Sequence, residues 1–449
     1  MKKYRFFSLP LLLSLLVCLL TPSALALEDP APEATAALLV DADHEVVLYE
    51  LNAHEKRYPA SITKIMTALL VLEAVDRGEL ALTDVIIAPQ GIHSGITAGA
   101  STQNIKSGEE MALLDLLYCV LVPSANEACN VVAHAVSGST DAFVEQMNLR
   151  AAELGMTGTH YVNTHGLHED DHYTTAWDIW LLSKEAMKHE LFREIVSTKE
   201  YYVPATNVSE QRHFYNTNAL LSQLKHSGYV YQPAIGIKTG STTEGGLCLV
   251  SAAEQDGRTL YCVILGAELA HQPDNSYRRM NFSETIRLFE WGFDNFSYRT
   301  ILESSDPVAE VAVTLSDTEH VLVRPEGSLA ALLPNDVNTE DFVQDIALFS
   351  ESVEAPVSEG QVLGKITLSL DGKTYGSLDL VALNDVERSE LLYHIDQGEK
   401  LIAQTWFKVA VVAAVVLVIL LIVHGVMRSK RKQRRSRSYV GYGGRRRRR

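Results

Sequence analysis

The sequence predicts a mixed α/β domain, followed by a small all-β domain and one membrane-spanning helix. Apolar strand-like segments lie at both ends of a helix-rich stretch, which is typical of an antiparallel sheet that encloses a helical subdomain. Short alternating segments dominate from about residue 306, and this pattern favours β structure. An apolar run without formal charge, residues 409–427, is long enough to cross the hydrocarbon core of a bilayer.

The amino terminus has the three parts of a secretory signal. Residues 1–5 are basic, residues 9–20 are almost wholly apolar, and Ala24-Leu25-Ala26 provides the small residues that a signal peptidase requires. The apolar run is shorter than the ~20 residues of a membrane span. We therefore predict a cleaved signal peptide over residues 1–26.

Residues 28–300 form the predicted catalytic domain. Two short apolar strands joined by a polar turn come first, and a helix with an apolar face begins at Pro59-Ala60-Ser61. Helical patterns fill the middle, and strands separated by turns return near residue 234. The predicted strands are residues 36–42, 45–49, 234–239, 247–253 and 260–265, and the further helices are residues 113–120, 127–136, 142–154 and 175–187.

Four cysteines remain after signal removal, and their spacing matches neither a metal site nor a dense disulfide framework. A two-residue turn at Asp256-Gly257 would pair Cys248 with Leu265 rather than with Cys262. We therefore expect buried free thiols and no metal. The four cysteines are Cys119, Cys129, Cys248 and Cys262.

The second predicted domain covers residues 306–385 and resembles a small β-sandwich. Residues 366–370 and 374–380 read as two strands around an Asp371-Gly372 hairpin turn. A polar stretch, residues 386–405, follows as a linker. The predicted membrane helix, residues 406–427, begins with an interfacial Trp-Phe pair.

Charge is divided unevenly along the chain, whose formal net charge is −17. The tail, residues 428–449, has 12 basic residues and no acidic ones, which predicts a cytoplasmic tail and an extracytoplasmic body anchored once in the cell membrane. Without the tail and the three basic residues of the signal, 24 basic residues face 56 acidic ones, so the body carries about −32. Repulsion by phosphate groups therefore argues against nucleic acid as a partner.

Three short patterns describe a serine acyl-transfer site. They are Ser-x-x-Lys at Ser61 and Lys64, Ser-x-Asn at Ser124 and Asn126, and Lys-Thr-Gly from Lys238. Ser-x-x-Lys alone is weak evidence, because it also occurs at residues 222–225 and 429–432. The order and spacing of the three motifs are stronger evidence, since a helix, a loop and a strand can contribute to one cleft.

Ser61 and Lys64 lie one helical turn apart on the same face, so that the amine can reach the hydroxyl. A lysine with its usual pKa of ~10.4 is protonated at neutral pH and can act as a base only where that pKa is depressed. We expect burial and a second cation, Lys238, to depress it. The backbone amides of Ser61 and Ser241 would bind the oxyanion, and Gly240 would leave room for a ligand along the strand edge.

Ser124 follows a proline between two helical segments, where its hydroxyl suits a proton relay to a leaving amine, and Asn126 suits a substrate amide. Considered alone, this motif could merely cap the helix that follows. Thr239 and Gly240 could likewise be an ordinary strand end, with Lys238 a solvated charge. The three patterns together favour the catalytic interpretation.

Longer stretches around these motifs resemble the penicillin-binding protein and serine β-lactamase superfamily, and more narrowly the low-molecular-mass penicillin-binding proteins of the D-alanyl-D-alanine carboxypeptidase type, peptidase family S11. The resemblance covers residues 36–385 and implies a β-lactamase/transpeptidase-like fold. The stretches that carry it are residues 59–67, 124–128, 154–156, 163–167, 236–240 and 360–364.

The resemblance implies that Ser61 attacks the bond between the two terminal D-alanines of a peptidoglycan stem peptide. Lys64 would then serve as base in both halves of the reaction, Lys238 and Thr239 would hold the terminal carboxylate, and β-lactams would acylate Ser61. No cofactor is required. His165 is expected to be structural, because the lysine replaces histidine as base in this family.

Some positions depart from the family pattern or leave alternatives open. Glu244 places an acid near the cleft mouth, and Thr217 stands where many relatives carry arginine, for which Arg212 or Arg258 would be substitutes. A D,D-endopeptidase that cuts cross-links and a non-catalytic membrane-held scaffold remain alternatives. A β-lactamase is disfavoured, because no convincing glutamate motif is present to activate a deacylating water.

Overall fold

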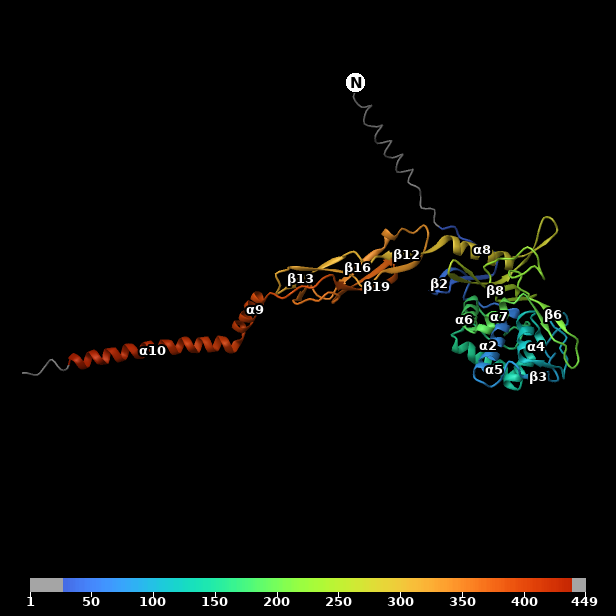
Figure 1. Ribbon diagram of the computed structural model, residues 1–449, viewed down its shortest axis with the longest axis horizontal. Coiled ribbons are helices and arrows are strands. Elements are labelled where there is room, and N and C mark those ends of the chain that lie inside the picture. The colour runs from blue at the N-terminus through green and yellow to red at the C-terminus, as the bar shows by residue number, and fades with distance from the viewer. Residues whose placement is uncertain (1–26, 438–449) are drawn as a thin grey trace, which may run out of the picture. The chain divides into compact units, whose positions relative to one another are not determined.

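The computed structural model describes residues 27–437, with side chains to residue 431, so the predicted signal peptide and the end of the basic tail lie outside the described residues. The chain divides into two compact units (Figure 1). The first extends to Ser297 and includes Leu332–Asp336, and the second comprises Tyr298–Ala331 and the chain from Val337 onward.

The first unit is built on a five-stranded antiparallel sheet with the strand order β2-β1-β9-β8-β7. Strands from the two ends of the domain therefore meet in one sheet, with β1 (Ala36–Asp41) paired to β9 (Arg258–Ala267). Strand β7 (Lys238–Thr242) pairs with β8 (Gly246–Gln255) and forms one edge of the sheet. The Lys-Thr-Gly motif thus lies on an edge strand.

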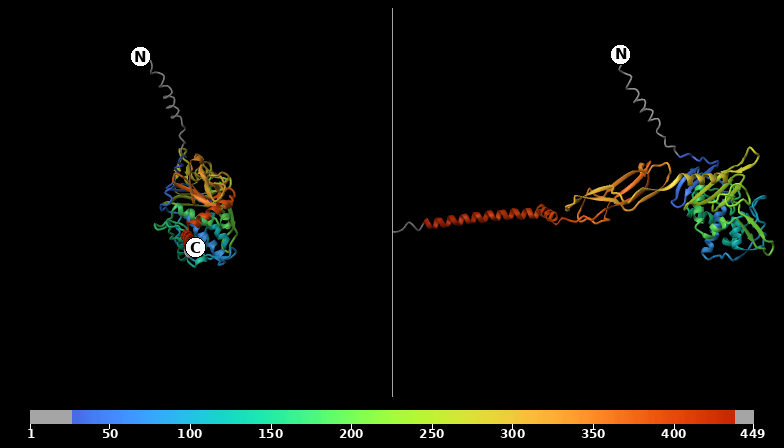
Figure 2. Two further views of the ribbon diagram at one scale, coloured as in Figure 1. Left: turned by 90° about the vertical axis from the view of Figure 1, so that its left-hand side faces the viewer. Right: turned by 45° about the horizontal axis from the view of Figure 1, so that its top comes forward.

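The two faces of this sheet are covered differently. Along β1, Ala36, Leu38 and Val40 pack into the core of the helical subdomain, whereas Ala37 and Leu39 pack into a second core with helix α8. This alternation follows from the two-residue period of a strand. Figures 1 and 2 show α8 on one side of the sheet and the helical subdomain on the other.

Every predicted helix of the first domain is present, and two more were not anticipated, namely α7 and α8. The 3-10 helix η1 carries Ser61 and leads directly into α2. The remaining elements of this unit are β2 (Val46–Leu51), η1 (Ala60–Thr63), α2 (Lys64–Asp76), β3 (Val85–Ile87), β4 (Glu110–Ala112), α3 (Leu113–Leu121), α4 (Asn126–Ser137), α5 (Thr140–Glu153), α6 (Ala176–Ala186), α7 (Glu190–Ser197), β5 (Glu200–Val203), β6 (Arg212–Tyr215), β10 (Leu269–His271), β11 (Tyr277–Arg279) and α8 (Met280–Asn295).

The strand predicted over residues 234–239 begins only at Lys238, and Ala234 makes a single bridge to Ala253. The predicted hairpin register is confirmed further along, where Ser251 lies opposite Cys262. An irregularity between Leu247 and Leu249 interrupts the pairing at Cys248 itself. All four body cysteines are buried and free, as expected.

The second unit contains a six-stranded sheet in the order β16-β18-β19-β14-β13-β17. Its pairs are antiparallel except for β13 with β17. The predicted hairpin is confirmed, since Asp371 and Gly372 have φ values of 49° and 79° and connect β18 to β19. Strands β12 and β15 form a separate two-stranded ladder. The bounds are β12 (Phe296–Leu302), β13 (Ala309–Thr314), β14 (His320–Pro325), β15 (Leu329–Pro334), η2 (Thr339–Asp341), β16 (Val343–Leu348), β17 (Ser352–Glu354), β18 (Val362–Leu370) and β19 (Lys373–Ala382).

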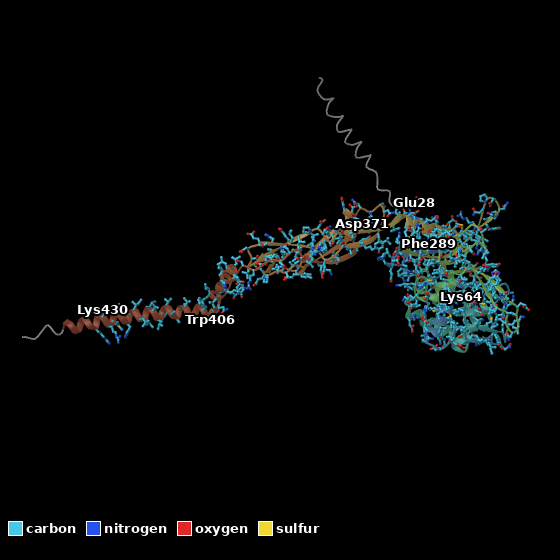
Figure 3. All side chains as sticks on the ribbon, viewed as in Figure 1. Glu28, Lys64, Phe289, Asp371, Trp406 and Lys430 are labelled. Carbon is cyan, nitrogen blue, oxygen red and sulfur yellow. The ribbon has the colours of Figure 1, made fainter. Side chains whose placement is uncertain are left out.

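Two helices follow the β domain. The segment predicted as a linker contains α9 (Glu390–Ala403), which the sequence analysis did not anticipate. Helix α10 (Thr405–Arg437) includes the predicted span, and its portion Thr405–Arg431 is long and apolar enough to cross a membrane. Figure 3 labels Trp406 and Lys430 on this helix.

Candidate active site

Ser61 and Lys64 form a close pair at the junction of η1 and α2. The Lys64 Nζ lies 2.9 Å from the Ser61 Oγ, which is hydrogen-bond distance. Ser61 is half-buried, whereas Lys64 is fully buried. Figure 3 labels Lys64 within the catalytic unit. The predicted nucleophile–base geometry is therefore present.

Two further acceptors surround the Lys64 amine. Its Nζ donates to the Asn126 Oδ1 and to the His165 carbonyl oxygen, both at 2.7 Å. A neutral amine has two hydrogens and one lone pair. In the neutral form, two hydrogens directed at Asn126 and His165 would leave the lone pair for the proton of Ser61.

Burial lowers the pKa of Lys64 to about 8, while Cys129 and Glu127 act in the opposite direction. Burial and then the nearby Lys64 lower the pKa of Lys238, so the two amines disfavour each other's charged form. Desolvation of the charged amine is thus the dominant cause of the lowered Lys64 pKa.

Ser124 lies in the short connection between α3 and α4, with a φ of 68° in the left-handed region. Its hydroxyl is buried and has no hydrogen-bond partner among the side chains and backbone that the structure describes. The N-cap of α4 is Ala125, and no side chain caps it. The capping interpretation of this motif is therefore wrong, and the hydroxyl is left for another role.

Gly240 brings β7 directly against the turn that carries Ser61. A Cβ built on Gly240 would lie 2.9 Å from the Pro59 carbonyl oxygen and 3.1 Å from the Ser61 nitrogen. Glycine was expected here to leave room for a ligand. The structure adds a second reason, because a side chain here would displace the Ser61 backbone.

The other residues of the Lys-Thr-Gly motif lie where the sequence predicted. Lys238 is buried, and its Nζ donates to the Thr239 carbonyl at 3.0 Å. No carboxylate pairs with Lys238 among residues 27–431. The Thr239 hydroxyl donates to the Thr217 Oγ1 at 2.6 Å, so Thr217 contacts the motif at the position where many relatives carry arginine. Ser241 is exposed on the same strand.

Arg212 and Arg258, considered as substitutes for an arginine at position 217, form ion pairs with other residues. Arg212 donates to both carboxylate oxygens of the buried Glu109, at 2.7 and 2.9 Å. Arg258 contacts Asp41 at 3.4 Å and donates to the Phe296 carbonyl at 2.7 Å. Both guanidinium groups are therefore already paired with a buried carboxylate.

A cavity of about 1250 Å³ opens beside the carboxyl end of β7. Ser241 and Glu244 line it from the strand and its turn, and Tyr58 lines it from the segment before Ser61. Asp170 and Tyr173 contribute from a separate loop. Glu244 lies at its wall, but Ser61, Lys64, Ser124 and Lys238 do not line it, so this cavity lies beside the serine cluster rather than around it.

His165 is buried, and its pKa is lowered to about 3 by burial and by the nearby Lys64. Its carbonyl contacts Lys64, while its Nδ1 accepts from the Leu167 amide at 3.2 Å. The ring therefore acts within its own loop, as the structural interpretation predicted. The hydrogen bond from Lys64 to the His165 carbonyl could not be predicted from the sequence, because every residue type has a backbone carbonyl.

Two family models match the chain, D-alanyl-D-alanine carboxypeptidase over residues 23–269 and penicillin-binding protein 5, C-terminal domain, over residues 296–388. The first model alone covers more than half of the chain, and it contains the complete Ser61 and Lys64 cluster. The chain belongs to the D-alanyl-D-alanine carboxypeptidase family. It is thus a serine hydrolase of peptidoglycan metabolism with the penicillin-binding fold.

Curated relatives agree over most of their length. D-alanyl-D-alanine carboxypeptidase DacC of Escherichia coli is 30% identical, over 87% of this chain and 94% of that protein. D-alanyl-D-alanine carboxypeptidase DacF of Bacillus subtilis is 28% identical, over 84% of this chain and 94% of that protein. Both likenesses extend through the family's catalytic and C-terminal domains.

Solved structures of similar proteins also match a large part of the chain. Penicillin-binding protein 5 of Haemophilus influenzae matches with a TM-score of 0.58 at 27% identity, covering 80% of this chain and 99% of that chain. The Streptomyces K15 DD-transpeptidase matches with a TM-score of 0.52 at 29% identity, covering 60% of this chain and 99% of that one. The shorter match corresponds to a protein that resembles only part of the present chain.

Proposed function

We propose that Ser61 is the nucleophile that removes the terminal D-alanine from peptidoglycan stem pentapeptides. The Ser61 Oγ attacks the carbonyl between the two D-alanines, and Lys64 accepts its proton. The observation that carries this proposal is the position of the Lys64 amine, which lies within hydrogen-bond distance of Ser61, Asn126 and His165. Its depressed pKa of about 8 makes the neutral form accessible.

The substrate backbone would extend along the free edge of β7. An edge strand presents unpaired backbone groups to an extended peptide. The amides of Ser61 and Ser241 would then hold the developing oxyanion. The close approach of Gly240 to the Ser61 nitrogen supports this assignment, because it places the two backbones side by side.

Lys238 and Thr239 are proposed to bind the terminal carboxylate of the substrate. Lys238 is buried without a carboxylate partner among the described residues, so a bound carboxylate would favour the charged form that burial disfavours. Thr239 presents a hydroxyl beside it. The Asn126 Oδ1 is occupied by Lys64, which leaves its amide hydrogens for a substrate carbonyl.

Ser124 is proposed to relay the proton to the departing amine. Its unpaired hydroxyl is suited to this task, since it can both accept and donate. D-Alanine then leaves with that proton, and an ester to Ser61 remains. Water, deprotonated by Lys64, hydrolyses the ester and regenerates the serine. A β-lactam would acylate the same oxygen.

The carboxypeptidase proposal is distinguished from cross-link cleavage by substrate preference. The full chain in detergent should release D-alanine from a stem pentapeptide faster than it cleaves a cross-linked dimeric muropeptide. Both products are quantified by chromatography of the same digests. Faster cleavage of the dimer would move the assignment to a D,D-endopeptidase, and no cleavage of either substrate would favour a scaffold.

The reaction is assigned to the domain predicted over residues 28–300, held outside the membrane by α10. The apolar length of Thr405–Arg431 and the basic residues from Arg428 support this topology. Added protease should remove the body from intact spheroplasts and leave a protected carboxyl-terminal fragment. Protection of the body instead would reverse the proposed orientation.

A further inference from the structure

The residue before the nucleophile has an unusual backbone conformation. Ala60 has a φ of 48°, in the left-handed region that residues with a side chain rarely adopt. Its carbonyl accepts a hydrogen bond from the Thr63 Oγ1 at 2.9 Å. The Ala60 carbonyl and the Ser61 N–H belong to one planar trans peptide and point in opposite directions. Whatever fixes that carbonyl therefore also aims the Ser61 amide.

Thr63 is held in turn by His172, which lies 109 residues further along the chain. The Thr63 Oγ1 and the His172 Nε2 are 2.8 Å apart. The His172 Nδ1 accepts from the Val162 amide at 3.2 Å, so the hydrogen of the neutral ring lies on Nε2. Nε2 therefore donates to Thr63, and the single hydroxyl hydrogen of Thr63 goes to Ala60.

This chain of hydrogen bonds is fully enclosed. Thr63 is 0% exposed and His172 is 1% exposed. Burial lowers the pKa of His172 to about 3, and the nearby His160, Lys64 and His168 act in the same direction, so the ring stays neutral. A bond between such buried groups has no competing water and keeps one direction.

Gly166 closes the other side of the same turn. A Cβ on Gly166 would overlap the Ala60 carbonyl and would lie 2.7 Å from the Thr63 Oγ1. Its φ of 88° also favours glycine. Gly166 directly follows His165, whose carbonyl contacts Lys64. One loop thus packs on the Ser61 turn and also contacts the base.

We propose that His172 is a positioning residue for the oxyanion site, acting through Thr63 and the Ala60 carbonyl to aim the Ser61 amide. It contacts neither Ser61 nor Lys64 directly in the hydrogen bonds of the described residues. The assignment rests on the proposed role of Ser61 as nucleophile. It adds a buried histidine to a site whose general base is a lysine.

The test removes hydrogen bonds of Thr63 or His172 with substitutions that keep the shape of the side chain. Thr63→Val deletes the hydroxyl, and His172→Phe deletes both ring nitrogens. Each should lower kcat for D-alanine release on the order of 10- to 100-fold with little change in KM, because the interaction strengthens only as the oxyanion forms. Thr63→Ser and His172→Gln, which keep a hydroxyl and a donor, should recover most of the rate.

The double variant Thr63→Val with His172→Phe should be no slower than the more impaired single variant, because both break one connected chain. Thr285→Val is a matched control, since Thr285 is a buried hydroxyl that bonds the Asn281 carbonyl in α8. The full chain is assayed in detergent. Rates are divided by the amount of serine that penicillin titrates, so that a variant with less folded protein does not appear slower for that reason.

A wild-type kcat per titrated serine in Thr63→Val would overturn the inference. A loss of kcat in Thr285→Val as large as that in Thr63→Val would also overturn it. His172→Phe alone is not decisive if little protein folds, and Thr63→Val then carries the test because its shape is nearly unchanged. Failure of the wild-type chain to acylate at Ser61 would instead overturn the proposed function. The two failures are therefore distinguishable.

Discussion

The two faces of the five-stranded sheet differ in what they bury. The buried residues on the face toward the helical subdomain include Lys64, Lys238, His165 and His172 beside apolar side chains. The face toward α8 is packed mainly by apolar groups such as Phe289. Buried amines are costly to desolvate. We therefore assign the proposed reaction to one face and expect the other mainly to stabilise the fold.

Removing the base should have the largest effect on acylation. Lys64→Met keeps much of the side-chain volume but leaves no proton acceptor beside Ser61. The rate of acylation by a fluorescent penicillin should fall at least about a thousandfold. Lys184→Met is the control, because Lys184 lies at the surface and pairs with Glu45. Acylation by Lys64→Met at a rate near wild type would mean that another group accepts the proton.

Shifting the Ser61 turn should have the next largest effect. Gly240→Ala introduces a Cβ 3.1 Å from the Ser61 nitrogen and should reduce kcat/KM on the order of 100-fold, because the nucleophile and the oxyanion donor move together. Gly398→Ala in α9 is a matched control, since a Cβ there meets nothing within 4 Å. Unchanged kinetics in Gly240→Ala would show that β7 does not set the position of Ser61.

The acylation rate should also depend on pH through Lys64. Its pKa is lowered to about 8, and below that value the amine carries a third hydrogen and has no lone pair for the Ser61 proton. The rate should therefore rise with pH, about tenfold per unit below the pKa, and level off above it. Stopped-flow acylation at constant ionic strength measures the profile. A rate that does not change across the region of the pKa would contradict this role of Lys64.

The smallest change in acylation is expected on the opposite face of the sheet. Phe289→Ala removes a fully buried ring from the α8 core and should lower the free energy of unfolding by about 3–5 kcal/mol. The acylation rate per folded molecule should stay unchanged. Thermal unfolding and penicillin titration of the same sample separate the two quantities. A slower rate per titrated serine would show that the two faces are coupled.

Local patterns predicted much of the fold and the centre of the site. The spacing of Ser61 and Lys64 and the Asp256-Gly257 turn depend on neighbours in sequence, and the structure agrees with both. Helix α8 was missed, although Phe282 and Phe289 form part of its buried face. The strand expected from residue 234 starts only at Lys238, although Ile235 and Ile237 already donate backbone hydrogen bonds to β8.

Contacts between distant segments were the part that sequence did not predict. His172 reaches Thr63 across 109 residues, and Thr217 meets Thr239 across 22. Neither pair has a characteristic local pattern. The contact that requires glycine at position 240 was not predicted either, since only the folded structure shows the backbone of Ser61 beside it. The residue types predicted that Gly240 belongs to the site, and the tertiary packing showed which contact requires a glycine at that position.

The most direct measurement follows D-alanine release from diacyl-Lys-D-Ala-D-Ala by the full chain in detergent, with mass spectrometry of the penicillin adduct. We expect wild-type protein to release D-alanine and to carry one penicilloyl group on Ser61, and we expect Ser61→Ala to do neither while remaining folded. An adduct on another residue, or continued D-alanine release by Ser61→Ala, would contradict the assignment of Ser61 as the nucleophile.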